Sequence, residues 1–377
     1  MIIDYVISIP LNEISGKSKA TLEKIDALIR SDNEVRVFYL KPTSSKSAKL
    51  LSMLILEINY FIKTSLSKNK PDLVFTRSYF CFGTWLVERL YSAKVIREVH
   101  ANFYDEAKIL FEDQPIKLAF SKLYEAYINY FINSSSGVIF NNPLLEGYYK
   151  RHILKSTVKT TSIYNGANTD LFKPRPIDEA RNALDYKFEA KKKHLLFLGS
   201  VSKWHGVEHL LNTFRELEQE RDDVVLLIVG GGNQDYLTKL ENNYCDLKNI
   251  VFIGPVPTDK AERYINSADA CVLPSANNRV SPGSPLKLYD YAACGKPIIS
   301  QENLPGYSDV IETHDLGTTV DYMNPKSAAK KISTYIDTYD CNRILKHNRD
   351  VTLTKLSWDI VIKHWLEFSQ GKLSTSP

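Results

Sequence analysis

The sequence has few of the residues that form covalent cross-links or metal centres. Its 377 residues include five cysteines, an odd number, and no pair of them has the spacing of a zinc site. They are Cys81, Cys245, Cys271, Cys294 and Cys341. This scatter is typical of reduced structural thiols, so we expect a cytoplasmic protein without a disulfide framework.

Long apolar runs are also missing. The longest is Leu50–Leu56, which is interrupted by Ser52 and is far shorter than a helix that spans a bilayer. The chain begins with a strand-like segment rather than with a leader pattern. We therefore expect neither a transmembrane helix nor a secretion signal.

Charge of one sign is not in large excess. The net charge is +4, and residues 1–172 carry 22 Lys and Arg against 17 Asp and Glu, which leaves −1 for the remainder. This bias is too small to indicate a nucleic-acid partner. It suits an anionic small molecule or an anionic membrane surface, either of which would meet the N-terminal half.

What the sequence does contain is two runs of alternating strands and helices. Apolar, β-branched segments predict buried parallel strands at 2–9, 35–39, 72–76, 94–99, 137–140 and 158–164, and then at 194–199, 224–229, 250–254, 270–273 and 317–320. Between them, helical periodicity predicts helices, among them a single long helix at 109–131. Residues 172–188, with Lys173-Pro174-Arg175-Pro176, are interpreted as a linker. An α/β protein with two doubly wound sheets follows.

The segment Lys41–Lys70 has a broad apolar face flanked by lysines. A basic amphipathic helix can lie on an anionic membrane. The alternative is a helix packed on the sheet with solvated lysines at its ends.

Several polar residues follow directly after predicted strands, where open α/β sheets bind ligands. His100 follows the strand 94–99, and Lys203 and His205 follow the strand 194–199. Gly230–Gly232 ends another strand and would let the backbone approach a ligand closely. The loop 199–206 is neither a dinucleotide fingerprint nor a phosphate-binding P-loop. An ordinary loop, or a structural histidine, is the alternative in each case.

The segment Ser281–Ser300 is the most informative. It predicts a loop, a helix opened by Ser284 and Pro285, a stop at Gly295 and a buried strand. The N–H groups of Leu286 and Lys287 would face out of the helix start and could hold a phosphate. Asp290 lies too deep in the helix to be a cap, and its carboxylate could accept two hydroxyls of a ribose. A helix with one surface aspartate is the alternative.

The chain resembles the retaining glycosyltransferases of the GT-B fold, of the large family-four group. The resemblance is carried by the order and spacing of several segments. They are Gly16, 98–100, 163–172, 199–206, 229–232, 253–257 and 284–297.

The resemblance implies roles for individual residues. Asp290 would bind the donor ribose, and Leu286, Lys287 and Gly16 the diphosphate. His100 matches the active-site histidine near the transferred sugar. His205 and Ser200 stand where many members carry Lys and Arg, and Lys203 would replace the missing charge. The candidate catalytic residues are His100, Lys203 and His205. The candidate donor-binding residues are Gly16, Gly199, Ser200, Gly231, Val256, Ser284, Leu286, Lys287 and Asp290.

The resemblance also implies the domains and the reaction. An acceptor domain of residues 1–172, completed by a C-terminal helix at about 358–377, would face a donor domain of residues 173–357 across a central cleft. A hexose would pass, without a metal or other cofactor, from a nucleotide-diphosphate sugar, expected to be a UDP-sugar, to a glycan or lipid-linked acceptor of a surface polysaccharide. The usual first acidic residue of the donor site falls at Pro282. A nucleotide-sugar epimerase or hydrolase, and a non-catalytic binding partner, are the alternatives.

Overall fold

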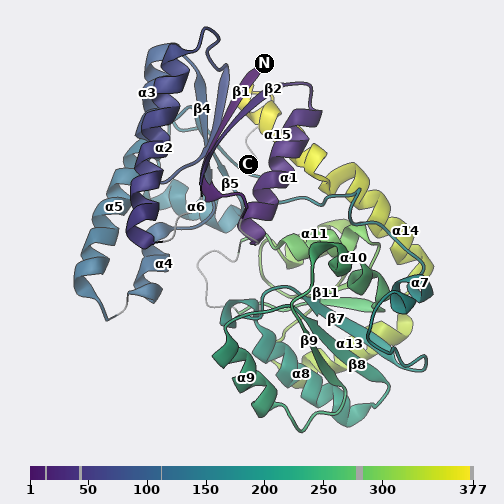
Figure 1. Ribbon diagram of the computed structural model, residues 1–377. Coiled ribbons are helices and arrows are strands. Elements are labelled where there is room, and N and C mark those ends of the chain that lie inside the picture. Colours follow the sequence, from purple (N-terminus) through teal and green to yellow (C-terminus); the bar gives the residue numbers. More distant parts are fainter. Residues whose placement is uncertain (13–14, 42–44, 112, 277–282, 374–377) are drawn as a thin grey trace. The chain divides into compact units, whose positions relative to one another are not determined.

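The computed structural model of the chain describes residues 1–12, 15–41, 45–111, 113–276 and 283–373. It divides into two compact units (Figure 1). The N-terminal unit comprises Met1–Asn165 and Trp358–Pro377, and the C-terminal unit comprises Gly166–Ser357. The chain thus crosses to the C-terminal unit once and returns for its last helix.

The N-terminal unit is built on a parallel six-stranded sheet of order β2-β1-β3-β4-β5-β6. The strands are β1 (Ile2–Pro10), β2 (Glu34–Leu40), β3 (Leu73–Arg77), β4 (Lys94–Val99), β5 (Gly137–Phe140) and β6 (Thr160–Ser162). The strand order reverses between β1 and β3, which are neighbours although β2 separates them in sequence. Because loops diverge at such a point, a doubly wound sheet leaves an opening at its carboxyl edge there.

Helices cover both faces of this sheet. They are α1 (Gly16–Arg30), α2 (Lys46–Leu66), α3 (Phe82–Tyr91), α4 (Phe103–Leu110), α5 (Pro115–Asn133), α6 (Pro143–His152) and α15 (Trp358–Ser369). Helix α15, far away in sequence, packs against α1 (Figure 1). On the other face α2 packs against α3, with Met53 and Tyr60 buried.

The predicted single helix 109–131 is two helices, because residues 115–131 lie in α5 and residues 109–110 end α4. Asn102 caps α4 through its side chain, which accepts from the Asp105 N–H, and Pro115 opens α5 as a separate helix. Proline fits the first turn of a helix but not its interior, so the break falls there. Gly16, which the resemblance assigns to the diphosphate, is the first residue of α1 and follows the cap Ser15.

The C-terminal unit has its own parallel sheet, of order β12-β11-β10-β7-β8-β9. The strands are β7 (Lys193–Leu198), β8 (Val224–Val229), β9 (Ile250–Gly254), β10 (Ala270–Leu273), β11 (Ile298–Gln301) and β12 (Gly317–Val320). The helical elements are α7 (Ile177–Asn182), η1 (Lys203–His205), α8 (Val207–Glu220), α9 (Gln234–Asn243), α10 (Thr258–Ser267), α11 (Leu286–Ala293), α12 (Ser308–His314), α13 (Pro325–Thr338), α14 (Cys341–Val351) and η2 (Thr352–Leu356).

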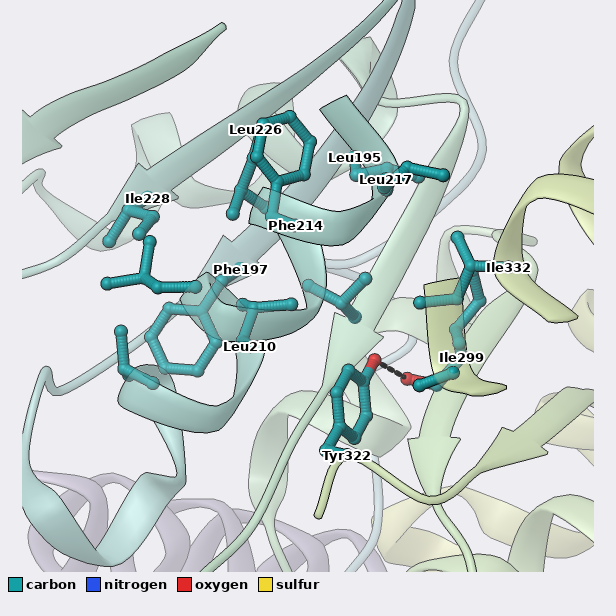
Figure 2. Close-up of a cluster of buried hydrophobic side chains, with 14 of the residues drawn as sticks. Leu195, Phe197, Leu210, Phe214, Leu217, Leu226, Ile228, Ile299, Tyr322 and Ile332 are labelled. Carbon is teal, nitrogen blue, oxygen red and sulfur yellow. Dashed lines mark hydrogen bonds between the residues drawn. The ribbon is translucent and has the colours of Figure 1, made fainter. Parts of the chain in front are cut away.

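The core of this unit lies between the sheet and the helices α8, α9 and α13 (Figure 2). Every residue of β8 is buried, as expected for a parallel strand covered on both faces. Among these residues the Tyr322 hydroxyl donates to the Ile299 carbonyl at 3.0 Å (Figure 2). Packing within this hydrophobic cluster therefore holds in place the strands at whose carboxyl ends the candidate site lies.

Residues 166–172 belong to the C-terminal unit, so the boundary lies seven residues before the predicted position. The Ala167 N–H donates to the Leu356 carbonyl at 2.8 Å. The Arg349 guanidinium donates to the carbonyls of Phe172 and Thr169. These bonds tie the crossing segment to the end of the same unit.

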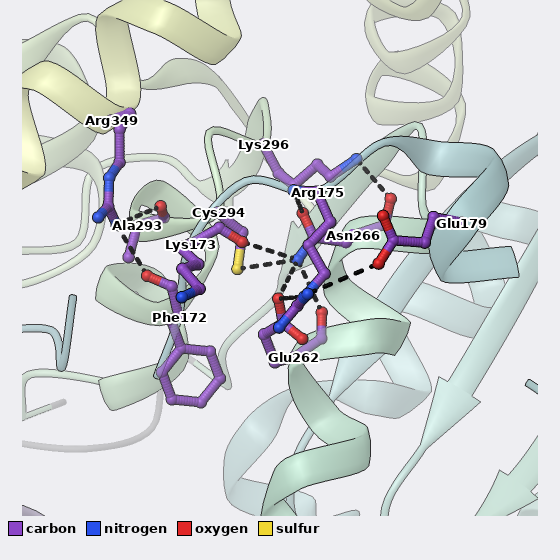
Figure 3. Close-up of polar contacts among 10 residues, drawn as sticks. All are labelled: Phe172, Lys173, Arg175, Glu179, Glu262, Asn266, Ala293, Cys294, Lys296 and Arg349. Carbon is purple, nitrogen blue, oxygen red and sulfur yellow. Dashed lines mark hydrogen bonds and ion pairs between the residues drawn. The ribbon is translucent and has the colours of Figure 1, made fainter. Parts of the chain in front are cut away.

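The predicted linker 172–188 is likewise an integral part of the C-terminal unit (Figure 3). The buried Asn266 side chain donates to the Lys173 carbonyl and accepts from the Arg175 N–H, both at 2.9 Å. Arg175 also pairs with Glu262 at 2.7 Å. Helix α7, which was not predicted, packs against α10. Helix α14 was also missed.

Candidate functional site

The loops after β7, β8 and β9 are joined into one surface at the carboxyl edge of the second sheet. Gly199 N donates to Val229 O at 2.9 Å, Val201 N to Gly231 O at 2.8 Å, and Gly230 N to Gly254 O at 2.8 Å. A Cβ on Gly230 would lie 1.9 Å from the Gly199 carbonyl oxygen, so only glycine fits there. The edge thus exposes backbone rather than bulky side chains.

The predicted residues of the 199–206 loop lie on this edge. Ser200 and Lys203 are exposed, and Lys203 opens the short helix η1. The ring of His205, half-buried, lies with Nδ1 2.9 Å from the Ser202 hydroxyl. Ala276, after β10, donates to the Trp204 carbonyl at 3.3 Å, which brings the next strand end alongside. Val256, partly buried, follows β9.

Helix α11 begins at Leu286, one residue later than the sequence suggested. Pro285 is its cap rather than part of its first turn. Before it, the Ser284 hydroxyl lies 2.8 Å from the Tyr289 hydroxyl. Asp290 is buried, with an exposed fraction of 5%. The helix stops at Cys294 and Gly295 as predicted, whereas Pro282 lies outside the described residues.

Lys287 is the unusual residue of this helix start. Its Nζ lies 4.1 Å from the centroid of the Phe197 ring on β7, and no hydrogen bond or ion pair to it is found in the described part of the chain. Burial lowers the pKa of Lys287 to about 7, since no anion compensates its charge. An unpaired cation beside helix-start N–H groups is an arrangement that an anionic ligand would complete.

In the N-terminal unit, His100 likewise lies at the carboxyl end of a parallel strand. It follows β4, its side chain is 19% exposed, and its Nε2 lies 2.9 Å from Glu98 Oε2. Burial and the Arg77 charge lower the pKa of His100 to about 3 even though Glu98 opposes the shift. His100 is therefore neutral at physiological pH. Gly16 starts α1 after β1 in the same unit.

Sequence reasoning missed the partners of these residues. The sequence predicts Phe197 only as part of a strand, but its ring contacts the Lys287 ammonium group. The resemblance includes Glu98 only as a neighbour of His100, but its carboxylate forms a hydrogen bond with the His100 ring. One signal was present: β4 holds Arg97 and Glu98, two charges within a strand that must be buried on both faces. Buried charges require partners, and those partners define a site.

Within the described ranges, no group of three or more His, Cys, Asp and Glu side chains is placed to hold a metal ion. Across the same residues, no helix combines the length and apolar character that crossing a bilayer requires.

Comparisons with known proteins agree with this architecture. Residues 179–350 match the family model for glycosyl transferases group 1. The chain is 23% identical to spore coat protein SA of Bacillus subtilis, over 93% of both chains. It is 20% identical to the lipopolysaccharide 1,2-N-acetylglucosaminetransferase of Salmonella typhimurium, over 62% of both. The solved structure of Anabaena Alr3699/HepE in complex with UDP-glucose has a TM-score of 0.69 at 17% identity, covering 98% of this chain and 100% of that one.

Proposed function

We propose that the chain catalyses sugar transfer, because residues 179–350 match the family model for glycosyl transferases group 1 and the whole chain has the GT-B fold. The enzyme moves a hexose-type sugar from a nucleotide-diphosphate sugar, a UDP-sugar, to a glycan or lipid-linked acceptor in surface polysaccharide synthesis. The likeness to a structure bound to UDP-glucose supports the proposed donor. The likeness to a lipopolysaccharide transferase supports the proposed acceptor.

The single observation that supports nucleotide-sugar binding is the position of Lys287 beside the start of α11, where no counter-ion is found in the described part of the chain. In the proposed complex the donor diphosphate lies against the N–H groups of Leu286 and Lys287 and the glycines 199 and 231. Lys203 adds positive charge, and His205 lies beside it in η1. The Asp290 carboxylate accepts the ribose hydroxyls, and the segment ending at Val256 frames the base.

Chemically, this arrangement stabilises a leaving group. When the bond from the anomeric carbon to the diphosphate oxygen breaks, negative charge grows on the diphosphate, where preorganised cations and N–H groups stabilise it. The acceptor oxygen forms its bond on the same face, which retains configuration. The acceptor proton passes to an oxygen of the departing phosphate, so the proposal needs no separate base and no metal.

The acceptor half rests on the N-terminal unit. The outer face of α2 exposes aliphatic side chains between lysines, and its one carboxylate, Glu57, is buried. The exposed residues are Leu50, Leu51, Ile55, Ile58, Ile62 and Leu66, with exposed fractions from 41% to 81%. Helix α5 also exposes large apolar side chains, namely Ile116, Phe120, Leu123 and Tyr130. We propose that the exposed face of α2 contacts the anionic inner membrane face, where a lipid-linked acceptor would lie.

The membrane contact is tested by co-sedimentation with vesicles. Binding to anionic vesicles should weaken as salt rises, because the lysine attraction is screened. Ile55→Ser with Ile62→Ser should reduce it, whereas the exposed Asn242→Ala on α9 should not. Equal binding to neutral and anionic vesicles would contradict the contact.

The reaction is tested by mass spectrometry of products from a panel of nucleotide sugars and lipid-linked acceptors. Transfer that survives EDTA supports the metal-free mechanism, and its loss contradicts it. Two other functions remain as alternatives. Free sugar or an epimer without acceptor would identify a hydrolase or epimerase, and donor binding without turnover would identify a binding partner.

A further inference from the structure

Strands β7 and β10 separate toward their carboxyl ends, where the strand order of the C-terminal sheet reverses. They are paired at Ala270 with Leu195 and at Cys271 with Leu196, which is the last pair among the described residues. In the described part of the chain the end of β7, from Phe197 onward, has a strand neighbour only in β8. Backbone groups on its other side therefore need a partner that is not a strand.

The side chain of Tyr291 supplies that partner. Its hydroxyl accepts a hydrogen bond from the Leu198 N–H at 2.9 Å and lies 3.5 Å from the Leu198 carbonyl oxygen, to which it donates. Tyr291 belongs to α11 and is completely buried. A buried hydroxyl needs hydrogen-bond partners, and the last residue of β7 offers both a donor and an acceptor. One side chain thus takes the place of the bonds that β10 would make with the end of β7.

Tyr291 and Lys287 contact the same strand end from one face of α11. They are four residues apart and so lie one helical turn from each other. Lys287 Nζ lies 4.1 Å from the Phe197 ring centroid and 3.2 Å from the position of a Cβ on Gly199. Tyr291 binds the residue between those two, Leu198. The helix that begins at the proposed diphosphate site is therefore bonded directly to the strand end on the other side of that site.

The loop after β7 is packed closely against the segment after β10. A Cβ on Gly206 would lie 2.6 Å from the Ser275 carbonyl carbon. The Ala276 N–H donates to the Trp204 carbonyl at 3.3 Å. Residues 200–203 lie between this contact and the end of β7, so a displacement of the strand end would also displace them.

We propose that Tyr291 is a positioning residue of the donor site, whose hydroxyl fixes the end of β7 relative to the start of α11. It acts through Leu198, and thereby sets where the Gly199 backbone and the loop 200–203 meet the diphosphate. A tyrosine with only a structural role would contribute to stability alone, whereas a positioning residue also determines nucleotide affinity. This inference rests on the proposed function.

Tyr291→Phe tests the proposal, because it removes the hydroxyl and keeps the ring. Tyr339→Phe is the matched control: the Tyr339 hydroxyl donates at 2.9 Å to the carbonyl of Asp269, which precedes β10 at the opposite edge of the same sheet. UDP binding is measured by isothermal titration at pH 8, under conditions where urea curves show all three proteins folded. Tyr291→Phe should bind UDP about tenfold more weakly than wild type, and Tyr339→Phe should bind it as wild type does.

Hydrogen exchange distinguishes positioning from a general loss of stability. Without UDP, the Leu198 amide should exchange about tenfold faster in Tyr291→Phe than in wild type, because it loses its partner. Exchange in β8 should be equal in Tyr291→Phe and Tyr339→Phe. Unchanged exchange at Leu198, or the same acceleration in both variants, would overturn the assignment.

Proton uptake gives a second readout that a purely structural role would not change. Burial lowers the pKa of Lys287 to about 7, so UDP binding at pH 8 should take up a proton in wild type. If the strand end moves in Tyr291→Phe, Phe197 covers the lysine less, the pKa rises, and fewer protons should be taken up. Tyr339→Phe should match wild type.

The outcomes separate this inference from the proposed function. Equal UDP affinity and proton uptake in wild type and Tyr291→Phe, or an equal loss of affinity in Tyr339→Phe, would overturn the inference and leave the proposed function standing. If wild type binds neither UDP nor UDP-glucose, both fail.

Discussion

Lys287 Nζ lies 4.1 Å from the ring centroid of Phe197, and the ring is completely buried at the end of β7. The contact joins the first turn of α11 to the strand whose loop carries Ser200 and Lys203. A cation over an aromatic face is stabilised, but much less than one paired with an anion. The charged form of Lys287 is therefore stabilised much more when a negatively charged ligand binds beside it.

Nucleotide binding should take up a proton. The pKa of Lys287 is lowered to about 7, so at pH 8 most of the side chain is neutral in the free protein. A bound diphosphate favours the charged form and raises this pKa, so binding UDP at pH 8 should take up between half a proton and one proton. Isothermal titration in buffers of different ionisation enthalpy measures the number directly.

The control for proton uptake is Lys287→Met, which should bind UDP more weakly and take up no proton. At pH 6, where Lys287 is already charged, wild type should take up close to none. Equal proton uptake by wild type and Lys287→Met at pH 8 would contradict the assignment of the lysine to the diphosphate.

Gly199→Ala should damage both stability and nucleotide binding. Gly199 has φ +133°, and an added Cβ would lie 3.2 Å from Cε and Nζ of Lys287. The backbone strain alone costs on the order of 1–3 kcal/mol of unfolding free energy. Gly371→Ala is the matched control, because its φ is +73° and its added Cβ meets nothing within 4 Å. Urea unfolding should show a loss in both variants, whereas UDP affinity should fall in Gly199→Ala alone.

Acid should destabilise the N-terminal unit through His100. The folded pKa is about 3, below the usual 6.5, so below pH 6.5 the unfolded chain binds a proton that the folded protein does not. Stability is therefore complete above pH 6.5 and falls toward acid, by at most about 1.4 kcal/mol per pH unit from this group. Urea unfolding between pH 7 and pH 5 measures it. His100→Asn should show a shallower slope, and an unchanged slope would refute the neutral assignment.

Asn266→Ala should destabilise the C-terminal unit. The Asn266 amide bonds Lys173, Arg175 and Glu262, and it is completely buried (Figure 3). Removing it leaves several buried groups without partners, at a cost of about 2–4 kcal/mol of unfolding free energy. Thermal unfolding should show a clear drop. The exposed Asn242→Ala is the control and should melt as wild type does, and similar melting of both variants would contradict the structural role.

Much of the fold was accessible from the sequence because buried parallel strands are compact apolar runs. The strands 94–99, 137–140, 224–229, 250–254, 270–273 and 317–320 were predicted with their observed bounds. In the segment 109–131 the helix from residue 115 was predicted, but the break before it was missed, since periodicity alone does not reveal the helix starts that the Asn102 cap and Pro115 impose. The linker 172–188 failed because its polar composition conceals bonds to the distant Asn266.

The candidate site was accessible only in part. Strand ends locate His100, Lys203 and Lys287, because loops at the carboxyl edge of a parallel sheet are sequence-local features. Their partners are distant in sequence: Lys24 meets Glu98 across 74 positions. Such contacts depend on how the helices pack on the sheet, and the local sequence around each residue does not predict this packing. The roles of the donor-binding residues, Asp290 among them, stay predictions.

The central claim is that the start of α11 binds the donor nucleotide for sugar transfer, and Asp290 tests it most directly. The measurement is kcat/KM for consumption of the donor found by the product panel, in wild type, Asp290→Ala and the exposed control Asp235→Ala. Loss of a charged hydrogen bond to the ribose should lower kcat/KM about 10- to 100-fold in Asp290→Ala and leave Asp235→Ala unchanged. Transfer by Asp290→Ala as fast as by wild type would contradict the account.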